Sequence, residues 1–189
     1  VAGGILSMVE SCGVHYLDVV RWFSGADITD VSGIGLTTEA DVPEGKYNYG
    51  MITVRLEDGS TGYYEAGWGN SISSEDLKEF VGPKGRIRLI QRKDRTSHGE
   101  EGDLIEYYNS ETRTYQMINV LCKRKHTGDQ LEHLIRMIEE DVPPVPSMEE
   151  VMESFRWALE ADRSIYESLA QNTGKRGKSN EYSGDRLSS

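Results

Sequence analysis

Hydrophobic residues near the start of the chain recur with the period of a helix. Val14, Leu17 and Val20 are spaced three apart and predict an apolar face on a helix over residues 14–23. Gly25 follows this stretch, and glycine is typical just past a helix C-terminus because it adopts the left-handed conformation without strain. The first predicted element is therefore a helix that buries one side.

The middle of the chain has the alternating pattern of β-strands. Residues 29–38 are rich in β-branched side chains, and residues 47–56 alternate between two faces. The Asp-Gly pair at residues 58–59 lies between two such runs and is a strong hairpin signal. Turns are also predicted at residues 82–85 and 109–113. The pattern predicts about six or seven strands joined mostly by hairpins, which makes the sheet antiparallel.

Two helices are predicted after the strands. Thr127 with Gln130 and Ser147 with Glu150 each fit a capping box, in which the two side chains bond to the first backbone N–H groups of a helix. Apolar residues follow both boxes at helical spacing. The composition then becomes polar and the hydrophobic period is lost, so we expect residues 172–189 to form a polar tail.

The order helix, strands, helices predicts an α+β protein. We expect an open, mostly antiparallel β-sheet of about six strands with helices packed on one face, and no Rossmann domain within the chain. The other face of the sheet would be solvated or paired with another subunit. We assign residues 1–171 to a single domain that precedes the tail.

The composition narrows the class of partner. The 189 residues carry a formal net charge of -11, which disfavours nucleic acid and anionic membranes because both need clustered positive charge. No apolar run is long enough to span a bilayer, and no signal peptide is visible. Cys12 and Cys122 are too few for a disulfide framework and fit reduced thiols in a cytoplasmic protein. The chain begins with Val1 rather than Met, so we expect it to be part of a longer protein.

Nucleotide and metal motifs are missing from the sequence. No G-x-G-x-x-G opens a helix after a strand, and no Walker loop, CxxC or HExxH is present. Cys122 and His126 lie close together with His133 further on, which gives too few ligands for a zinc site. We therefore expect this chain to bind neither a nucleotide nor a metal.

The stretch ESCGVHYLDVVRW, residues 10–22, places a histidine and an aspartate at the start of the first helix. His15 and Asp18 are one turn apart and share a side of that helix. On the residues alone, two interpretations stay open. His15 is either a helix-entry histidine with structural hydrogen bonds or an active-site group. Asp18 is a site residue, an exposed helix residue or one partner of a salt bridge to Arg21.

Five stretches of the sequence resemble one family and occur in the same order. They are GGILSMVESCGVHYLDVVRWFSG (residues 3–25), DGSTGYYEAGW (58–68), VGPKGRIRL (81–89), HTGDQLEHLIRMIE (126–139) and PSMEEVMESFRWALEADRSIYES (146–168). Together they resemble the C-terminal domain of the glucose–fructose oxidoreductase / inositol dehydrogenase family (Gfo/Idh/MocA).

The resemblance implies a two-domain plan for the parent protein. A Rossmann domain outside this chain would bind NAD or NADP. The present chain would shape the substrate pocket and form a homo-oligomer through the open face of its sheet. The reaction implied is hydride transfer between nicotinamide and a hydroxyl-bearing carbon of a small sugar or polyol-like substrate.

The resemblance also implies roles for particular residues. His15 matches the family's catalytic histidine, and imidazole suits proton transfer because it titrates near neutral pH. Asp18 matches a residue that contacts substrate or orients the site. His126 lies where members often have a His-Gly pair, which makes it a candidate substrate contact. Many members have an aspartate four residues before the catalytic histidine. Ser11 occupies that position here and Glu10 lies one residue earlier, so both are substrate-binding candidates.

A second class of function stays open. Ser11 in place of an acidic residue, together with the missing nucleotide motif, also fits a non-catalytic module that binds a sugar-like ligand or only dimerises. The sequence upstream of Val1 would separate the two classes, because a dehydrogenase needs a dinucleotide-binding unit.

Overall fold

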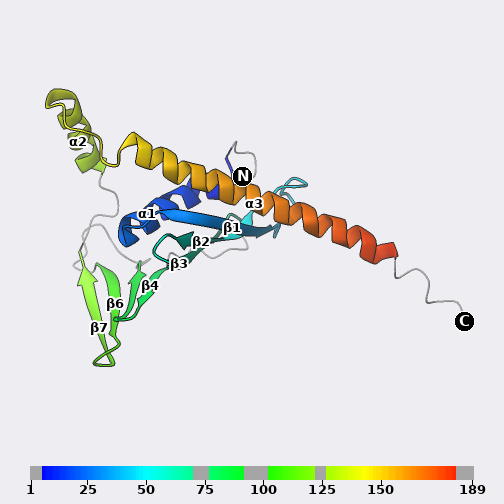
Figure 1. Ribbon diagram of the computed structural model, residues 1–189, viewed down its shortest axis with the longest axis horizontal. Coiled ribbons are helices and arrows are strands. Elements are labelled where there is room, and N and C mark those ends of the chain that lie inside the picture. Colours follow the sequence, from blue (N-terminus) through cyan, green and yellow to red (C-terminus); the bar gives the residue numbers. More distant parts are fainter. Residues whose placement is uncertain (1–5, 70–76, 92–101, 122–126, 182–189) are drawn as a thin grey trace, which may run out of the picture. The chain divides into compact units, whose positions relative to one another are not determined.

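The computed structural model describes residues 6–69, 77–91, 102–121 and 127–181, with side chains as far as residue 171. The chain divides into two compact units (Figure 1). One unit consists of residues 1–72 together with 143–189, and the other consists of residues 73–142. Each unit has an antiparallel sheet of its own.

The first unit is a three-stranded sheet with helices on one face, as Figure 1 shows. The strand order is β1-β2-β3, and both pairs are antiparallel. A π-helical turn leads directly into the first α-helix, and a long helix returns across the sheet at the C-terminal end. The elements are η1 (Val9–Gly13), α1 (Val14–Ser24), β1 (Ile28–Leu36), β2 (Tyr49–Leu56), β3 (Thr61–Gly67) and α3 (Met148–Glu181).

Helix α3 packs very closely on β1 and β2, because glycines face it from the sheet. A Cβ atom at Gly33 would lie 2.5 Å from Ile165 Cγ1, and one at Gly35 would lie 2.6 Å from Ile165 Cγ2. Ile165 is fully buried, and the inward residues Ile52 and Val54 belong to the same core. Gly33 and Gly35 thus form the seat of one isoleucine.

A buried polar contact also joins α3 to the strand region. Tyr47, just before β2, donates its hydroxyl hydrogen bond to Asp162 Oδ1 at 2.5 Å, and both residues are buried. Burial, and then the hydrogen bond to Asp162, raise the pKa of Tyr47 far above its ordinary value. The contact therefore depends on a protonated phenol.

The Tyr47→Phe variant is expected to lower the free energy of unfolding by about 1–3 kcal/mol at neutral pH, because it leaves a buried carboxylate without its donor. The folded state favours the neutral phenol, so this stabilisation is present below the unfolded tyrosine pKa of about 10 and is lost as pH rises beyond it. Urea unfolding of both proteins across this range measures the effect. Equal losses for wild type and variant above this pH would contradict the assignment to Tyr47.

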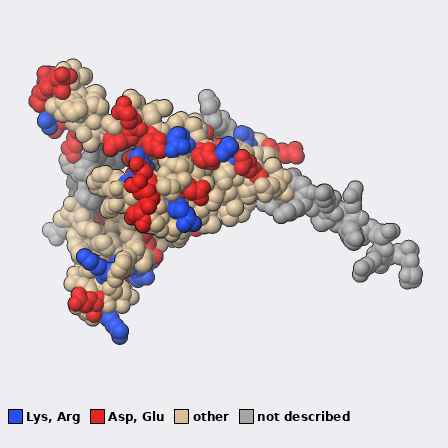
Figure 2. Space-filling view, in the orientation of Figure 1, with Lys and Arg blue, Asp and Glu red and all other residues tan. Residues whose placement is uncertain are grey.

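The solvent side of α3 carries charges of both signs. Figure 2 shows acidic and basic side chains alternating along this helix. Arg156 pairs with Glu153 at 2.6 Å, and Arg163 pairs with Glu160. The described part of this surface is therefore a solvated helix face. Its opposite charges are three residues apart, the spacing at which side chains on a helix can form ion pairs.

The second unit is a four-stranded sheet with strand order β4-β5-β6-β7 and one helix that follows it in the chain. On one sheet face, Glu79 and Glu106 hold two arginines: Arg86 Nη2 lies 3.2 Å from Glu106 and Arg88 Nε lies 3.3 Å from Glu79. Cross-strand ion pairs of this kind support the register of neighbouring strands. The elements are β4 (Leu77–Gly82), β5 (Gly85–Ile90), β6 (Asp103–Asn109), β7 (Thr114–Val120) and α2 (Thr127–Glu139).

The predicted α+β class and its antiparallel hairpins are confirmed. Helix α1 ends at Ser24, and Gly25 adopts the left-handed conformation with φ 66°. The capping box at the start of α3 is present, because Ser147 N–H donates to Glu150 Oε2 at 2.6 Å and Glu150 N–H donates to Ser147 Oγ at 3.2 Å. Signals within a few residues of each helix end were therefore sufficient to predict where α1 ends and where α3 begins.

Some details differ from the expected outline. The strands number seven and divide into sheets of three and four within the described residues. A π-helical turn precedes α1, which the sequence did not indicate. Helix α3 continues to Glu181, so its backbone extends past residue 172, where the hydrophobic period ends.

Candidate functional site

The predicted catalytic histidine lies at the junction of two helical geometries. His15 is exposed in the first turn of α1, directly after η1. The Val14 N–H donates to Val9 O, which is a bond between residues five apart. In such a turn the side chain one turn before His15 is that of Glu10 rather than that of Ser11. Single π-helical turns of this kind are frequent at functional sites.

Glu10 also forms hydrogen bonds that cap the start of this helical stretch. The Ser7 N–H donates to Glu10 Oε2 at 2.7 Å, and the Glu10 N–H donates to Ser7 Oγ at 3.1 Å. This is a capping box, and it fixes the entry of the helix that carries His15. Ser11 is half-buried, and its N–H donates to Ser7 O at 2.9 Å. Ser7 therefore organises the backbone around both candidate residues.

Asp18 is held by a residue from the other end of the chain. Ser154 on α3 is buried and donates to Asp18 Oδ1 at 2.9 Å. The same hydroxyl accepts a hydrogen bond from Arg21 Nη1 at 3.0 Å. The ion pair of Arg21 is with Asp27, at 2.9 Å. Arg21 is therefore linked to Asp18 through Ser154, which positions the carboxylate and ties α1 to α3.

The Ser154→Ala variant is expected to lower the free energy of unfolding by about 1–3 kcal/mol, because a half-buried carboxylate and a guanidinium both lose a partner. Chemical denaturation of variant and wild type measures this. Ser154→Thr keeps the hydroxyl and is the matched control. An unchanged free energy of unfolding for Ser154→Ala would show that the link between α1 and α3 contributes nothing to stability.

The structure thus places Glu10, Ser11, His15 and Asp18 on one continuous helical stretch. His126, the remaining candidate, lies outside the described residues, and so does Cys122. Of the residues that the sequence reasoning missed, Ser7 had a local signal, since Ser7 and Glu10 have capping-box spacing. The other missed residue, Ser154, is on α3, and no local sequence pattern could connect it to Asp18 on α1.

The described residues offer no cluster of three or more His, Cys, Asp and Glu side chains that could hold a metal ion. Among the same residues, no helix is long and apolar enough to cross a membrane. Nor do they contain a glycine loop between a parallel strand and a helix, the unit that commonly holds a dinucleotide.

A family model for the GFO/IDH/MocA C-terminal domain matches residues 3–88. Residues 3–88 are a GFO/IDH/MocA C-terminal domain. This confirms the family predicted from the sequence motifs, and the matched region includes the helix that carries His15 and Asp18. No curated protein is significantly similar to the chain in sequence.

Solved structures extend the likeness beyond the matched residues of the GFO/IDH/MocA domain. Aldose-aldose oxidoreductase from Caulobacter crescentus, complexed with glycerol, superposes with a TM-score of 0.64 at 15% identity, covering 82% of this chain and 44% of that one. Scyllo-inositol dehydrogenase from Lactobacillus casei, with bound NAD(H) and scyllo-inositol, gives 0.59 at 19%, covering 88% and 48%. At these identities the likeness concerns the fold. The chain spans less than half the length of these two proteins.

Proposed function

We propose that this chain is the substrate-binding and oligomerisation half of an NAD(P)-dependent oxidoreductase. The reaction is a hydride transfer between a hydroxyl-bearing carbon of a sugar or polyol and nicotinamide. The observation that carries the proposal is the exposed His15 at the entrance of α1, one turn before an Asp18 carboxylate fixed by Ser154, within a matched GFO/IDH/MocA domain. The solved structures with glycerol and with scyllo-inositol support the substrate class.

His15 acts as the acid–base group in this proposal. When the substrate alcohol is oxidised, its O–H proton passes to the His15 imidazole while the C–H hydride leaves the same carbon, and a carbonyl forms. In the reverse direction the imidazolium returns the proton to the carbonyl oxygen. An exposed histidine can reach a substrate without desolvating a charged partner of its own.

Asp18 binds a substrate hydroxyl in this proposal. A carboxylate accepts hydrogen bonds, and Ser154 already donates to its Oδ1. The fixed orientation lowers the entropy lost on substrate binding. Glu10 and Ser11 act mainly through the helix entry, whereas His126 stays a proposed substrate contact.

The cofactor does not fit the described residues of this chain. They contain no dinucleotide-binding unit, so the nicotinamide, which accepts or returns the hydride, belongs to another domain of the parent. We expect a homo-oligomer through the open sheet face, and we expect the isolated chain to be inactive.

A panel of polyols and aldoses tests the proposed reaction, with the parent protein and either NAD⁺ or NADP⁺ present and nicotinamide reduction followed by absorbance. The proposal expects turnover with at least one vicinal polyol and none with the isolated chain. A parent that binds the panel compounds without turnover would favour the second candidate, a non-catalytic binding module. One observation favours that alternative: the carboxylate five residues before His15, that of Glu10, is engaged by the Ser7 N–H.

A further inference from the structure

Tyr47 is joined by a chain of hydrogen bonds to the helical stretch that carries His15. Its hydroxyl donates to Asp162 Oδ1 on α3 at 2.5 Å. It also hydrogen-bonds with the Ser7 side chain, which partly offsets the rise in the Tyr47 pKa that burial and Asp162 cause. Ser7 Oγ in turn accepts from the Glu10 N–H at 3.1 Å. The chain of bonds thus runs from α3 to the start of η1.

The donors in this chain of bonds all point in one direction. Because Ser7 Oγ accepts from an N–H group, its own hydrogen is free to donate to the Tyr47 oxygen. Tyr47 then donates its hydrogen to Asp162, which is buried. Hydrogen bonds arranged in this way polarise and strengthen one another. Tyr47 is the middle member, and its hydroxyl both accepts and donates.

The segment that presents Tyr47 is itself held in place. Asn48 is buried, and its Nδ2 donates to Thr38 Oγ1 and to Trp68 O, each at 2.7 Å. The Tyr47 ring packs edge-on against Tyr166 of α3, with ring centroids 5.5 Å apart. The Tyr47 hydroxyl is therefore a fixed point from which another segment can be oriented.

The helix entry before His15 needs such a fixed point. Met8 and Val9 follow Ser7 and are buried in the core. Hydrophobic burial is non-directional, so it holds the turn against the core without setting its rotation. Hydrogen bonds depend on angle as well as distance. The bonds at Ser7 therefore set how η1, and α1 that continues from it, is oriented.

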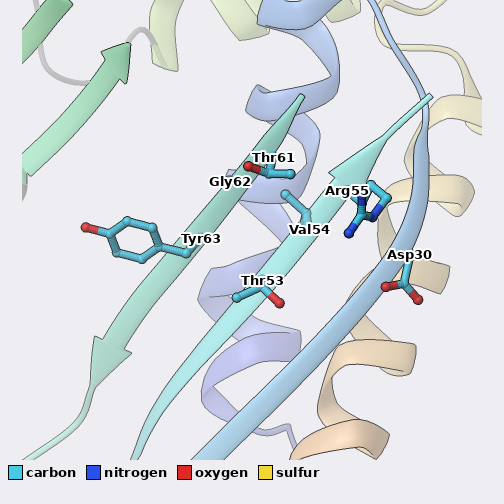
Figure 3. A pocket seen from close by; sticks show the side chains of 7 residues that line it. All are labelled: Asp30, Thr53, Val54, Arg55, Thr61, Gly62 and Tyr63. Atoms are coloured by element: carbon cyan, nitrogen blue, oxygen red, sulfur yellow. The ribbon is translucent and has the colours of Figure 1, made fainter. Parts of the chain in front are cut away.

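The other end of this turn is fixed by packing against β3. A Cβ atom at Gly13 would lie 3.4 Å from Tyr64 Cε1, and Tyr16 stacks on Tyr64 with ring centroids 4.5 Å apart. Successive side chains of a strand point to opposite faces. Tyr63 accordingly extends away from the neighbouring strands in Figure 3, where it lines a hollow of about 330 Å³. His15 lies between Gly13 and Tyr16, so the segment that carries it is anchored at both ends.

We propose that Tyr47 is a positioning residue for His15. Bonded to Asp162 and to Ser7, it holds the π-helical turn in the orientation that presents the imidazole to the substrate. Tyr47 is buried and acts through Ser7 rather than on the substrate. This inference rests on the role proposed for His15 and adds the residue that sets its orientation. A misplacement of about 1 Å, caused by a substitution away from the reacting atoms, can lower a rate about 100-fold.

Steady-state kinetics of the parent protein test the role of Tyr47. Tyr47→Phe removes only the hydroxyl, and kcat is expected to fall about 10–100-fold while KM stays within about twofold, because substrate contacts are kept and the proton-transfer geometry is lost. A loss of stability alone does not change kcat of the folded enzyme, and circular dichroism at the assay temperature verifies folding. Tyr166→Phe is the matched control, because its hydroxyl accepts from Lys46 instead, and it should keep wild-type kcat.

A double-mutant cycle shows whether Tyr47 acts through Ser7. Ser7→Ala removes the next hydroxyl and is expected to lower kcat/KM as well. Because both act by one path, the double variant should lose little more than the more severe single variant. Tyr47→Phe combined with Ser154→Ala, which acts on Asp18 through a separate hydrogen bond, should show additive losses. Additive losses for Tyr47 with Ser7, or an unchanged kcat for Tyr47→Phe, would overturn the proposal.

Amide chemical shifts of the isolated chain separate this inference from the proposed reaction. The Glu10 and Ser11 amide signals are expected to shift more in Tyr47→Phe than in Tyr166→Phe, since only the former removes the partner of Ser7. Equal shifts would overturn the positioning role. The expected shifts together with a parent that does not turn over would overturn the proposed reaction and leave the anchoring of the turn by Tyr47 in place. If Tyr47→Phe is unfolded, Ser7→Ala at its half-buried position replaces it, and an unchanged kcat is the contradicting result.

Discussion

Replacing His15 by alanine is expected to lower kcat/KM of the proposed parent oxidoreductase by about 10²–10⁴-fold, the usual range for loss of a general acid–base group. The reason is that the hydroxyl proton then has no acceptor at the reacting oxygen, while the exposed position of His15 leaves the core intact. Steady-state kinetics with the best substrate of the polyol panel measure the effect. The loss should fall mainly in kcat, because proton transfer occurs in the chemical step.

His133→Ala is the matched control for this experiment. His133 lies on α2 and has no role in the proposed reaction, so kcat/KM should stay within about twofold of wild type, in the range of substitutions that leave transition-state binding unaltered. Circular dichroism shows whether both variants are folded. A His15→Ala parent with unchanged kcat would remove His15 from the chemistry and return it to a helix-entry residue.

Replacing Ile165 by alanine is expected to lower the free energy of unfolding by about 2–5 kcal/mol, as for other large-to-small core substitutions. Ile165 is fully buried where α3 crosses the glycine seat on β1 and β2. The glycines carry no side chains that could repack into the space, so the variant keeps most of its cavity. Leu159→Ala, on an exposed part of the same helix, is the control and should change stability far less.

A second substitution tests the contact between Gly33 and Ile165. Gly33→Ala alone is expected to cost about 1–3 kcal/mol by overpacking, because its new Cβ meets Ile165 Cγ1. In the double variant with Ile165→Ala the contact with Ile165 Cγ1 is gone and part of the cavity is filled, although the new Cβ still lies 3.2 Å from Ala161 O. The combined loss should therefore be smaller than the sum of the two single losses. Additive losses in urea unfolding would contradict the direct contact.

The elements that the sequence predicted well are those with local causes. The apolar period of α1, the Asp-Gly turn between β2 and β3, and the Ser147–Glu150 capping box all depend on residues within one or two turns of each other. Their hydrogen bonds are made within the same element or hairpin. Periodicity and turn chemistry therefore suffice to find them.

The features that the sequence did not predict depend on distant contacts. Ser154 is 136 residues from Asp18, and its hydrogen bond exists only because α3 returns across α1. Gly33 and Gly35 gave no signal of their own, since their meaning comes from Ile165. The π-helical turn inserts a residue into an otherwise regular helix, and no periodic pattern in Val9–Gly13 predicts the insertion. The ion-pair partners on the second sheet likewise follow from register rather than from spacing.

The candidate site was partly predictable for the same reason. His15 and Asp18 are one turn apart in the sequence and remain on one helix in the structure. Glu10 was predicted as a substrate contact, and the structure adds its role in the capping box with Ser7. The link from Asp18 through Ser154 to Arg21 belongs to the tertiary fold.

The central claim is that this chain is one half of a nicotinamide-dependent enzyme, and calorimetric titration tests it most directly. The parent protein and the isolated chain are each titrated with NAD(H) and with NADP(H). We expect saturable binding of at least one cofactor to the parent and none to the chain, since the described residues hold no dinucleotide unit. A parent that binds neither cofactor would contradict the account and leave a binding and assembly module in its place.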